Sequence, residues 1–171
     1  PAPGIATTAL LEEALFLVQR RSAGRAQAAT HAPAGVPLAL DELPRFALVI
    51  PARPNSLRRL VESALAARRQ RPQISLEIDG VAASLDLVAD GAGCAVLPMN
   101  AVTTSGKPEV FSTRPIHGAG SDGEDAEASG NTRLRSKLFM AVSSQRPATL
   151  RQPARAELIR ATLQALDRSP P

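Results

Sequence analysis

The sequence predicts an α/β domain in which short buried strands alternate with amphipathic helices. Between residues 46 and 102, compact apolar runs flanked by turn residues alternate with segments whose apolar residues recur at three-and-four spacing. This alternation favours right-handed βαβ units and a mostly parallel sheet. Hydrophobic residues make up 44% of the 171 positions and charged residues 21%, which is the balance of a globular protein with a core.

The predicted strands are the apolar runs at 15–18 (LFLV), 47–50 (ALVI), 74–78 (ISLEI), 94–97 (CAVL) and 137–142 (KLFMAV). Helices are expected where apolar residues share one face. The first carries Leu57, Leu60, Val61, Ala64 and Leu65 and runs to about Arg69, the second carries Val81, Leu85, Leu87 and Val88, and the last spans about 154–166 with Leu158, Ile159, Leu163 and Leu166 on one face. Segments 20–35 and 117–131 lack such a stripe and are predicted loops, and we expect 122–128 to be disordered and dispensable.

Composition narrows the classes of function. The formal net charge is +4, from 18 Arg and two Lys against 16 acidic residues, and the chain has four Phe but no Tyr or Trp to stack on bases. Direct nucleic-acid binding is therefore disfavoured. No apolar run approaches the roughly 20 residues of a transmembrane helix, which argues against a membrane partner. The single cysteine, Cys94, excludes an intramolecular disulfide and fits a reducing, cytoplasmic location.

The chain shows no constellation for catalysis, and we expect no metal and no cofactor. His31 and His117 fall in predicted loops, and no histidine pair has helical ligand spacing. Cys94 lies in an apolar strand, where an inert core thiol is expected. The Gly-x-Gly at 91–93 closes a helix and opens a strand, which is the reverse of the order in nucleotide-binding loops. Gly91 is therefore predicted to be a left-handed helix C-cap.

The turn after the run at 47–50 is the first candidate binding site. Asn55 or Ser56 is placed to cap the next helix, and Pro54 makes the start of that helix rigid. Free N–H groups of the first helical turn, together with the Ser56 hydroxyl, would receive a carboxylate or phosphate. Arg53 and Arg58 would add planar donors for an anion. The alternative is an ordinary capped helix with solvated arginines.

A second turn follows the run at 74–78. Asp79 is predicted to cap the helix that comes next, and Gly80 relaxes the backbone. An aspartate that already satisfies a helix start makes this turn a poorer anion site than the first. The Asp79 carboxylate would instead accept a hydrogen bond from a ligand hydroxyl or amine.

The order of these segments resembles the effector-binding domain of LysR-type transcriptional regulators. The resemblance rests on 40–65 (LDELPRFALVIPARPNSLRRLVESAL), 74–98 (ISLEIDGVAASLDLVADGAGCAVLP), 136–147 (SKLFMAVSSQRP) and a closing helix. It covers roughly 37–166, and its most specific piece is 87–98. It implies a periplasmic-binding-protein-like (type 2) fold whose two lobes hold a small-molecule effector between them.

On that resemblance the chain contains mostly lobe two. Residues 1–14 are expected to be a remnant of lobe one and the crossover, 15–142 the effector-binding lobe two, and 143–171 a C-terminal segment and helix that belong to lobe one. Part of lobe one has no counterpart, and the insertion at 118–130 departs from the family's shorter connection. The expected effector-binding residues are Pro51, Arg53, Pro54, Asn55, Ser56, Arg58 and Asp79.

The predicted function is that of a sensor and not of an enzyme. The resemblance implies the effector-sensing domain of a bacterial LysR-type regulator, which binds a small metabolite, with an anion as one candidate class. DNA would be contacted only through a separate N-terminal helix-turn-helix, and the full-length protein would be a homo-oligomer. The alternative is an extracytoplasmic solute-binding protein of the same fold, and the third hypothesis is an enzyme such as a dehydratase or deaminase.

Overall fold

The computed structural model describes residues 4–21, 35–118, 133–143, 157–159 and 161–162. The chain divides into two compact units, of which one is Ala14–Ser136 and the other comprises Pro1–Glu13 with Lys137–Pro171. Of the predicted last helix, 157–159 and 161–162 are helical, and the rest lies outside the described residues. The stretch predicted to be disordered, 122–128, also lies outside them.

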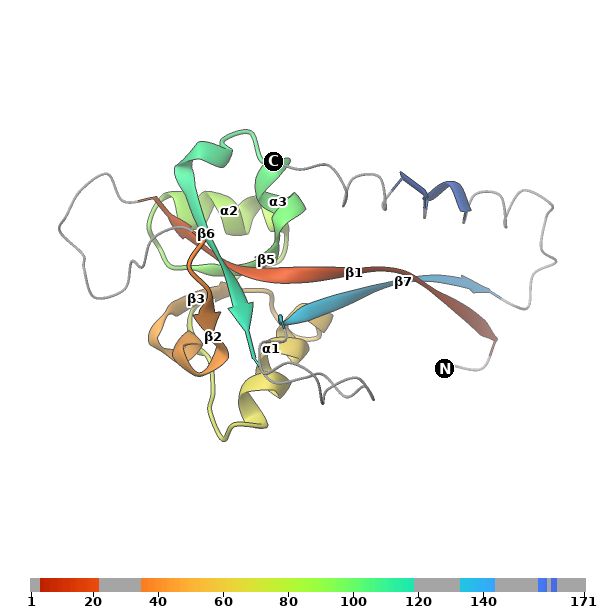
Figure 1. Ribbon diagram of the computed structural model, residues 1–171, viewed down its shortest axis with the longest axis horizontal. Helices are drawn as coiled ribbons and strands as arrows, with labels where there is room; N and C mark the ends of the chain where they lie inside the picture. Colours follow the sequence, from red (N-terminus) through yellow and green to blue (C-terminus); the bar gives the residue numbers. More distant parts are fainter. Residues whose placement is uncertain (1–3, 22–34, 119–132, 144–156, 160, 163–171) are drawn as a thin grey trace. The chain divides into compact units, whose positions relative to one another are not determined.

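Strands and helices follow one another in the order that Figure 1 shows. They are β1 (Ile5–Arg20), β2 (Leu38–Ala39), the 3-10 helix η1 (Leu40–Arg45), β3 (Ala47–Ile50), α1 (Ser56–Ala66), β4 (Gln73–Glu77), α2 (Val81–Ala89), β5 (Ala95–Pro98), α3 (Met99–Thr103), the 3-10 helix η2 (Pro108–Val110), β6 (Phe111–His117) and β7 (Arg135–Ser143). All five predicted strands and the first two predicted helices are present, although α1 ends three residues before the expected Arg69.

Strand β1 organises the larger sheet. It pairs antiparallel with β5, where Leu17 lies opposite Val96, and antiparallel with β6, where Leu17 lies opposite Arg114. Strand β7 also pairs with β1, and β2 pairs parallel with β6. Strands β3 and β4 form a separate parallel pair. Cys94 links β3 to the start of β5, because its N–H donates to the Ala47 carbonyl and its carbonyl accepts from the Val49 N–H, both at 2.8 Å.

The expectation of a mostly parallel sheet is wrong for the five-stranded sheet, in which β1 pairs antiparallel with both β5 and β6 and the short β2–β6 pair is parallel. The prediction came from the alternating stretch 46–102, and there β3 and β4 are indeed parallel. Strand β1 precedes that stretch and β6 follows it. Both β5 and β6 run in the direction opposite to β1. Alternation within one stretch carries no information about how flanking strands pair with it.

Strand β6 was not predicted, because its sequence (FSTRPIH) contains Arg114 and Pro115 within an otherwise plausible strand. The structure satisfies Arg114 although its exposed fraction is only 6%. Its Nε donates to the Val36 carbonyl at 3.0 Å and its Nη2 to the Pro37 carbonyl at 3.3 Å. A buried cation that is hydrogen-bonded in this way loses much of its desolvation penalty, so the strand tolerates it.

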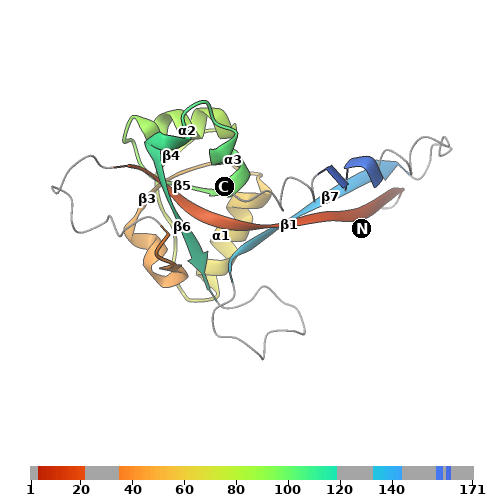
Figure 2. The same cartoon turned by 45° about the horizontal axis from the view of Figure 1, so that its top comes forward.

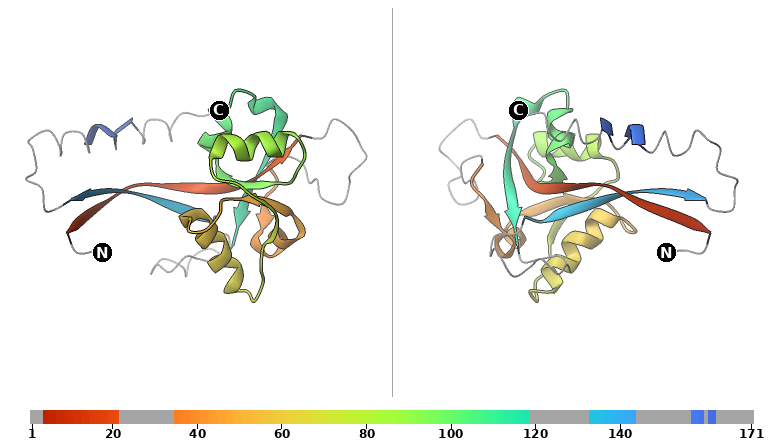
Figure 3. Two further views of the ribbon diagram at one scale, coloured as in Figure 1. Left: turned by 180° about the vertical axis from the view of Figure 1, so that it is seen from behind. Right: turned by 45° about the vertical axis from the view of Figure 1, so that its right-hand side comes forward.

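The two main helices of the larger unit cover opposite faces of the strands, as Figures 2 and 3 show. Val61 and Leu65 of α1 belong to one core cluster, which also contains Leu17 and Val96. Leu85 and Val88 of α2 belong to a second, with Val18, Ala95 and Leu97. Successive residues of a strand point to opposite faces, which is why 95 and 97 pack with α2 and 96 packs with α1.

Helix α2 ends as the sequence predicted. Gly91 has a φ of +84°, the left-handed conformation that glycine adopts without steric penalty. Its N–H donates to the Val88 carbonyl at 3.0 Å, and the N–H of Ala92 donates to the Leu87 carbonyl at 2.9 Å. This pair of bonds is a Schellman C-cap, so the glycine-containing segment terminates a helix.

Candidate functional site

The turn between β3 and α1 is capped by Asn55. Its Oδ1 accepts hydrogen bonds from the N–H groups of Leu57 at 2.9 Å and Arg58 at 3.2 Å. Ser56 is the first residue of the helix and is exposed. Of the two caps that the sequence allowed, Asn55 is the one that forms, since its extended backbone directs the amide oxygen at the second and third N–H groups of the helix.

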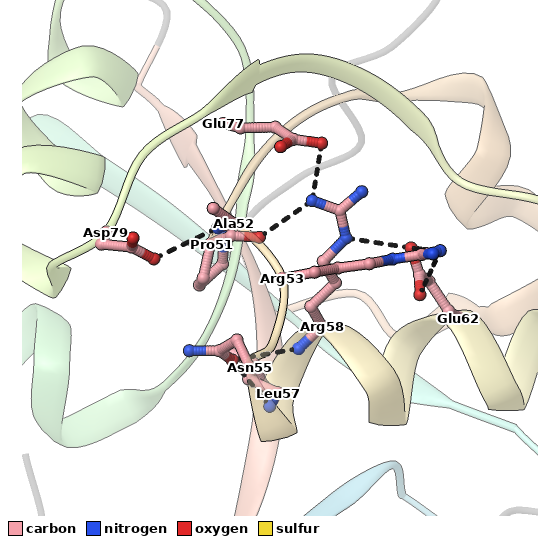
Figure 4. A network of polar contacts seen from close by, with 9 residues as sticks. All are labelled: Pro51, Ala52, Arg53, Asn55, Leu57, Arg58, Glu62, Glu77 and Asp79. Atoms are coloured by element: carbon pink, nitrogen blue, oxygen red, sulfur yellow. Dashed lines mark hydrogen bonds and ion pairs between the residues drawn. The ribbon is translucent and has the colours of Figure 1, made fainter.

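Two side-chain donors at this turn remain free within the described part of the chain. The Asn55 oxygen faces the helix, so its Nδ2 points outward, and it has no partner among the described residues. The Ser56 hydroxyl likewise has none there. In Figure 4 the Asn55 nitrogen and the Arg53 guanidinium lie on opposite sides of the view. The turn therefore has a side with free donors and a side occupied by an ionic network.

The two arginines of the turn are bound by carboxylates of the same chain. Arg53 Nη2 lies 2.9 Å from both Oε1 and Oε2 of Glu62. Arg58 Nε donates to the same Glu62 Oε1 at 2.9 Å. The hydrogen bonds from Arg53 and then Arg58 hold the pKa of Glu62 below its ordinary value. Both arginines thus have a carboxylate partner in the chain, Arg53 through Nη2 alone with a side chain that is 68% exposed, and their role toward an anionic ligand stays a prediction.

Arg58 is the buried member of the network. Its side chain is 7% exposed, and its Nη1 donates to the Pro51 carbonyl at 3.1 Å and contacts Glu77 Oε1 at 2.6 Å. The hydrogen bonds to Glu62 and then Glu77 raise the pKa of Arg58. Figure 4 shows the guanidinium between these partners from α1, β4 and the turn.

Asp79 does not cap α2, so that prediction is wrong. The N-cap of α2 is Gly80, with a φ of +105°, and no side chain caps that helix. Asp79 Oδ1 instead accepts a hydrogen bond from the Ala52 N–H at 3.2 Å. The left-handed Gly80 accounts for the difference, because it turns the chain into the helix one residue later than a capping aspartate would require.

Sequence reasoning missed two residues of the network, Glu62 and Glu77. Glu62 lies four residues after Arg58, a spacing that brings side chains together on a helix. Arg58 itself lies three residues before Val61 on the buried stripe, and a cation in such a position needs a carboxylate nearby. Together these two features could have predicted an ion pair between Arg58 and Glu62 from the sequence. Glu77, by contrast, becomes a partner only through the pairing of β3 with β4.

A groove of about 720 Å³ lies on the network side of the turn, between α1, the loop that follows it and the start of β4. Its lining includes Arg53, Glu62, Arg69, Arg71 and Ile74. The donors of Asn55 and Ser56 are not part of it.

The remaining chemical groups support no further site in the described residues. Burial raises the pKa of the Cys94 thiol, which accepts a hydrogen bond from Gln19 Nε2 at 3.6 Å, as expected of an unreactive core cysteine. Within the described ranges no three His, Cys, Asp or Glu side chains are grouped to hold a metal. His31 lies outside those ranges, and His117 ends β6. None of the described helices has both the length and the apolar character needed to cross a bilayer.

The pairing of strands and the two strand-turn-helix segments define a periplasmic-binding-protein-like (type 2) domain. The family model for the LysR substrate binding domain matches residues 1–164, and the chain belongs to that family of transcriptional-regulator effector domains. The family and the fold class that the sequence predicted are confirmed.

Solved structures agree with this fold. The H2O2-bound C206S mutant of OxyR from Corynebacterium glutamicum aligns with a TM-score of 0.71 at 14% identity, over 96% of this chain and 46% of that one. The CcmR regulatory domain of Synechocystis PCC6803 in complex with 2-PG aligns with a TM-score of 0.67 at 13% identity, over 95% and 69%. Full-length CbnR with its target DNA gives 0.65 at 18%, over 95% and 47%. The chain thus spans about half the length of the OxyR and CbnR chains, and a search of curated proteins found no match.

Proposed function

We propose that this chain forms one wall of the effector site of a LysR-type regulator, with the 51–56 turn and Asp79 at that wall. In this proposal 15–142 is lobe two, while 1–14 and 143–171 belong to lobe one. The compact unit Ala14–Ser136 supports the assignment over 15–136, whereas 137–142 belong to the other compact unit. The small molecules in two neighbouring structures, 2-PG in the CcmR domain and shikimate in the QuiR domain, support a small metabolite as the effector.

The observation that carries the proposal is the pair of free donors, Asn55 Nδ2 and the Ser56 hydroxyl, at the start of α1. Helix α1 has 11 residues and no acidic residue in its first turn, so nothing within that turn compensates the positive end of the helix dipole. Such a helix start favours a carboxylate or phosphate.

Asp79 adds a second requirement to the ligand. One of its oxygens accepts from Ala52, and the side chain belongs to an exposed residue, so the other oxygen can accept a hydrogen bond from a hydroxyl or amine. An effector with an acidic group and a hydroxyl or amine a short distance away would satisfy both sides of this wall.

The whole regulator would act on DNA through a separate helix-turn-helix, as a homo-oligomer in the cytoplasm. The full-length CbnR structure with its target DNA, of which this chain spans 47%, supports a regulator of that kind. Effector binding would change DNA binding only if the effector has different affinities for two arrangements of the lobes. The enzyme hypothesis gains no support from the residues of the turn, since no nucleophile and base are paired there.

A ligand panel on the full-length regulator tests the proposal. Thermal unfolding is measured with small carboxylates and phosphates, including 2-PG and shikimate, for the wild type and for Asn55→Asp. Aspartate caps a helix as well as asparagine does, so the stability of α1 is preserved. The change removes the Nδ2 donor and adds a negative charge, so we expect anions that stabilise the wild type to lose most of their effect.

Ser56→Ala should weaken the same response, whereas Arg53→Ala should change it little because Glu62 already holds Arg53. Basal DNA binding should stay intact in all three variants. Arg59→Ala, an exposed residue of α1, serves as the control. Equal ligand-induced shifts in the wild type, Asn55→Asp and Ser56→Ala would reject the turn as the effector wall and leave it an ordinary helix cap.

A further inference from the structure

A charged residue occupies the core-facing stripe of α1. Arg58, Val61 and Leu65 are the buried residues of that helix, and their spacing of three and four places them on one face. An apolar residue would be the ordinary occupant of the first position. A buried cation costs free energy unless it is paired and hydrogen-bonded. The contacts of the Arg58 side chain therefore indicate its role in the structure.

The guanidinium of Arg58 connects three separate parts of the fold. Nε donates to Glu62 on the same helix at 2.9 Å. Nη1 donates to the carbonyl of Pro51, the first residue of the turn, at 3.1 Å and contacts Glu77, the last residue of β4, at 2.6 Å. One side chain therefore links the start of the turn to a strand end 26 positions further along the chain.

Two neighbouring contacts run between the same strand ends. The N–H of Ile78 donates to the Ile50 carbonyl at 3.1 Å, and Asp79 accepts from the N–H of Ala52 at 3.2 Å. The last residue of β3 and the two that follow it, 50–52, thus meet the last residue of β4 and the two that follow it, 77–79. The Glu77 contact differs from the other two, because it reaches the turn only through Arg58.

The ionic network at the turn has no net charge that would attract an anion. Arg53 and Arg58 contribute two positive charges, and Glu62 and Glu77 contribute two negative charges, so the cluster is neutral as a whole. The free donors of Asn55 and Ser56 are separate from it. The Arg58 side chain reaches the turn directly at the Pro51 carbonyl and indirectly through Glu62, which it shares with Arg53.

We propose that Arg58 is a positioning residue that ties the start of the 51–56 turn to the end of β4 through Glu77. It thereby fixes where Asn55 and Ser56 present their donors, without touching the effector. That consequence for binding rests on the proposed function, whereas the tie itself does not.

Amide hydrogen exchange on the full-length regulator without any ligand tests the tie. Glu77→Gln removes the charge at the exposed end of the connection and leaves the amino-acid sequence of α1 and of the turn unchanged. Arg58→Met keeps an unbranched apolar stem in the core and removes all three contacts. Glu62 keeps Arg53 as a partner and Glu77 is 49% exposed, so neither carboxylate is left buried without compensation. Glu109→Gln makes the same chemical change on an exposed glutamate of η2 and is the matched control.

We expect peptides that cover 51–58 to exchange on the order of fivefold faster in Glu77→Gln and faster still in Arg58→Met, from the loss of one or several charge-assisted hydrogen bonds. Peptides from β1 and α2 should exchange as in the wild type, and Glu109→Gln should change nothing. Unchanged exchange at 51–58 in Glu77→Gln, or an acceleration that is equally large in β1 and α2, overturns the proposal.

The two proposals fail separately. The exchange experiment contains no effector, so a loose turn in Glu77→Gln would support the tie even if no compound of the panel distinguishes Asn55→Asp from the wild type. Conversely, ligand shifts that depend on Asn55 while exchange stays uniform would support the effector wall and reject the role of Arg58.

Discussion

Asp79 accepts a hydrogen bond from the backbone N–H of Ala52 at 3.2 Å, across 27 positions of the chain. This contact joins the two turns that the sequence had marked as separate candidate sites. It also uses a backbone N–H that would otherwise be free at the end of β3. The two turns are therefore connected by a hydrogen bond, and a substitution at Asp79 should affect the other turn.

Asp79→Ala should lower stability by at most about 1 kcal/mol, because a hydrogen bond between exposed groups contributes at the low end of the usual range. Asp79→Asn keeps an oxygen that can accept from Ala52 and should lower stability less. The measurement is urea denaturation of each variant beside the wild type. A loss of several kcal/mol in Asp79→Ala would show that the residue supports more of the fold than this contact.

Acid should weaken the network through Glu62. Its pKa lies below the ordinary value of 4.5 because Arg53 and Arg58 donate to its carboxylate. A carboxyl group whose pKa is lower in the folded protein binds fewer protons there than in the unfolded chain. Its contribution to stability is therefore fully present above the unfolded pKa and is lost as pH falls through the folded pKa.

Glu62→Gln tests that sign. Denaturation of the wild type and the variant should differ most near neutral pH, and the difference should shrink as pH falls below 4.5 toward the lowered pKa. Glu109→Gln, at an exposed position in η2, should track the wild type throughout. A stability difference that is constant across the whole pH range would mean that Glu62 contributes by packing and not by its charge.

Gly93 should not tolerate a side chain. A Cβ there would lie 2.6 Å from the Ala47 carbonyl oxygen and 2.9 Å from Ser75 Oγ, and the first of these atoms belongs to the backbone of β3 and cannot rotate away. Gly93→Ala should cost about 1–3 kcal/mol, as overpacking of a closed site does. Gly106→Ala is the control, since a Cβ at Gly106 has no neighbour within 4 Å. Thermal unfolding of the two variants decides the matter.

Local patterns of the sequence predicted the parts of the fold that depend on local chemistry. The strand at 47–50, helix α1 with its Asn55 cap and the Gly91 terminator are all visible in short stretches, since each is stabilised by contacts within a few residues. Strand β6 could not be predicted from local patterns, because it depends on contacts with residues far away in the sequence. Its Arg114 is satisfied by carbonyls at Val36 and Pro37, 77 and more positions earlier, and no local pattern reports such partners.

In the candidate site, too, local sequence predicted some residues and not others. Asn55 and Ser56 could be placed at a helix start from neighbouring residues alone. The roles of Arg58 and Asp79 could not, because Glu77 and Ala52 approach them only after β3 and β4 have paired. Arginines beside a helix start suggest an anion site when only the sequence is considered, because the sequence does not show which carboxylates the fold places next to them.

The last prediction concerns the smaller unit, Pro1–Glu13 with Lys137–Pro171, whose described residues leave several large apolar side chains exposed. Phe139 is 55% exposed and Leu138 45% on β7, Ile5 is 45% exposed on β1, and Leu158 is 68% and Ile159 44% exposed. Leu163 and Leu166, which the sequence placed on the same helical face, lie outside the described residues. Fully burying one such side chain stabilises by roughly 1.5–3 kcal/mol, so several exposed together favour association.

Residues 1–171 expressed alone should therefore self-associate with rising concentration, as light scattering would show. Phe139→Ser should shift that association to higher concentration. Leu76→Ser removes a comparably exposed side chain, 42%, from β4 in the larger unit and should leave association unchanged. A monomer at all concentrations, or equal effects of the two substitutions, would mean that the apolar residues of the smaller unit do not drive assembly.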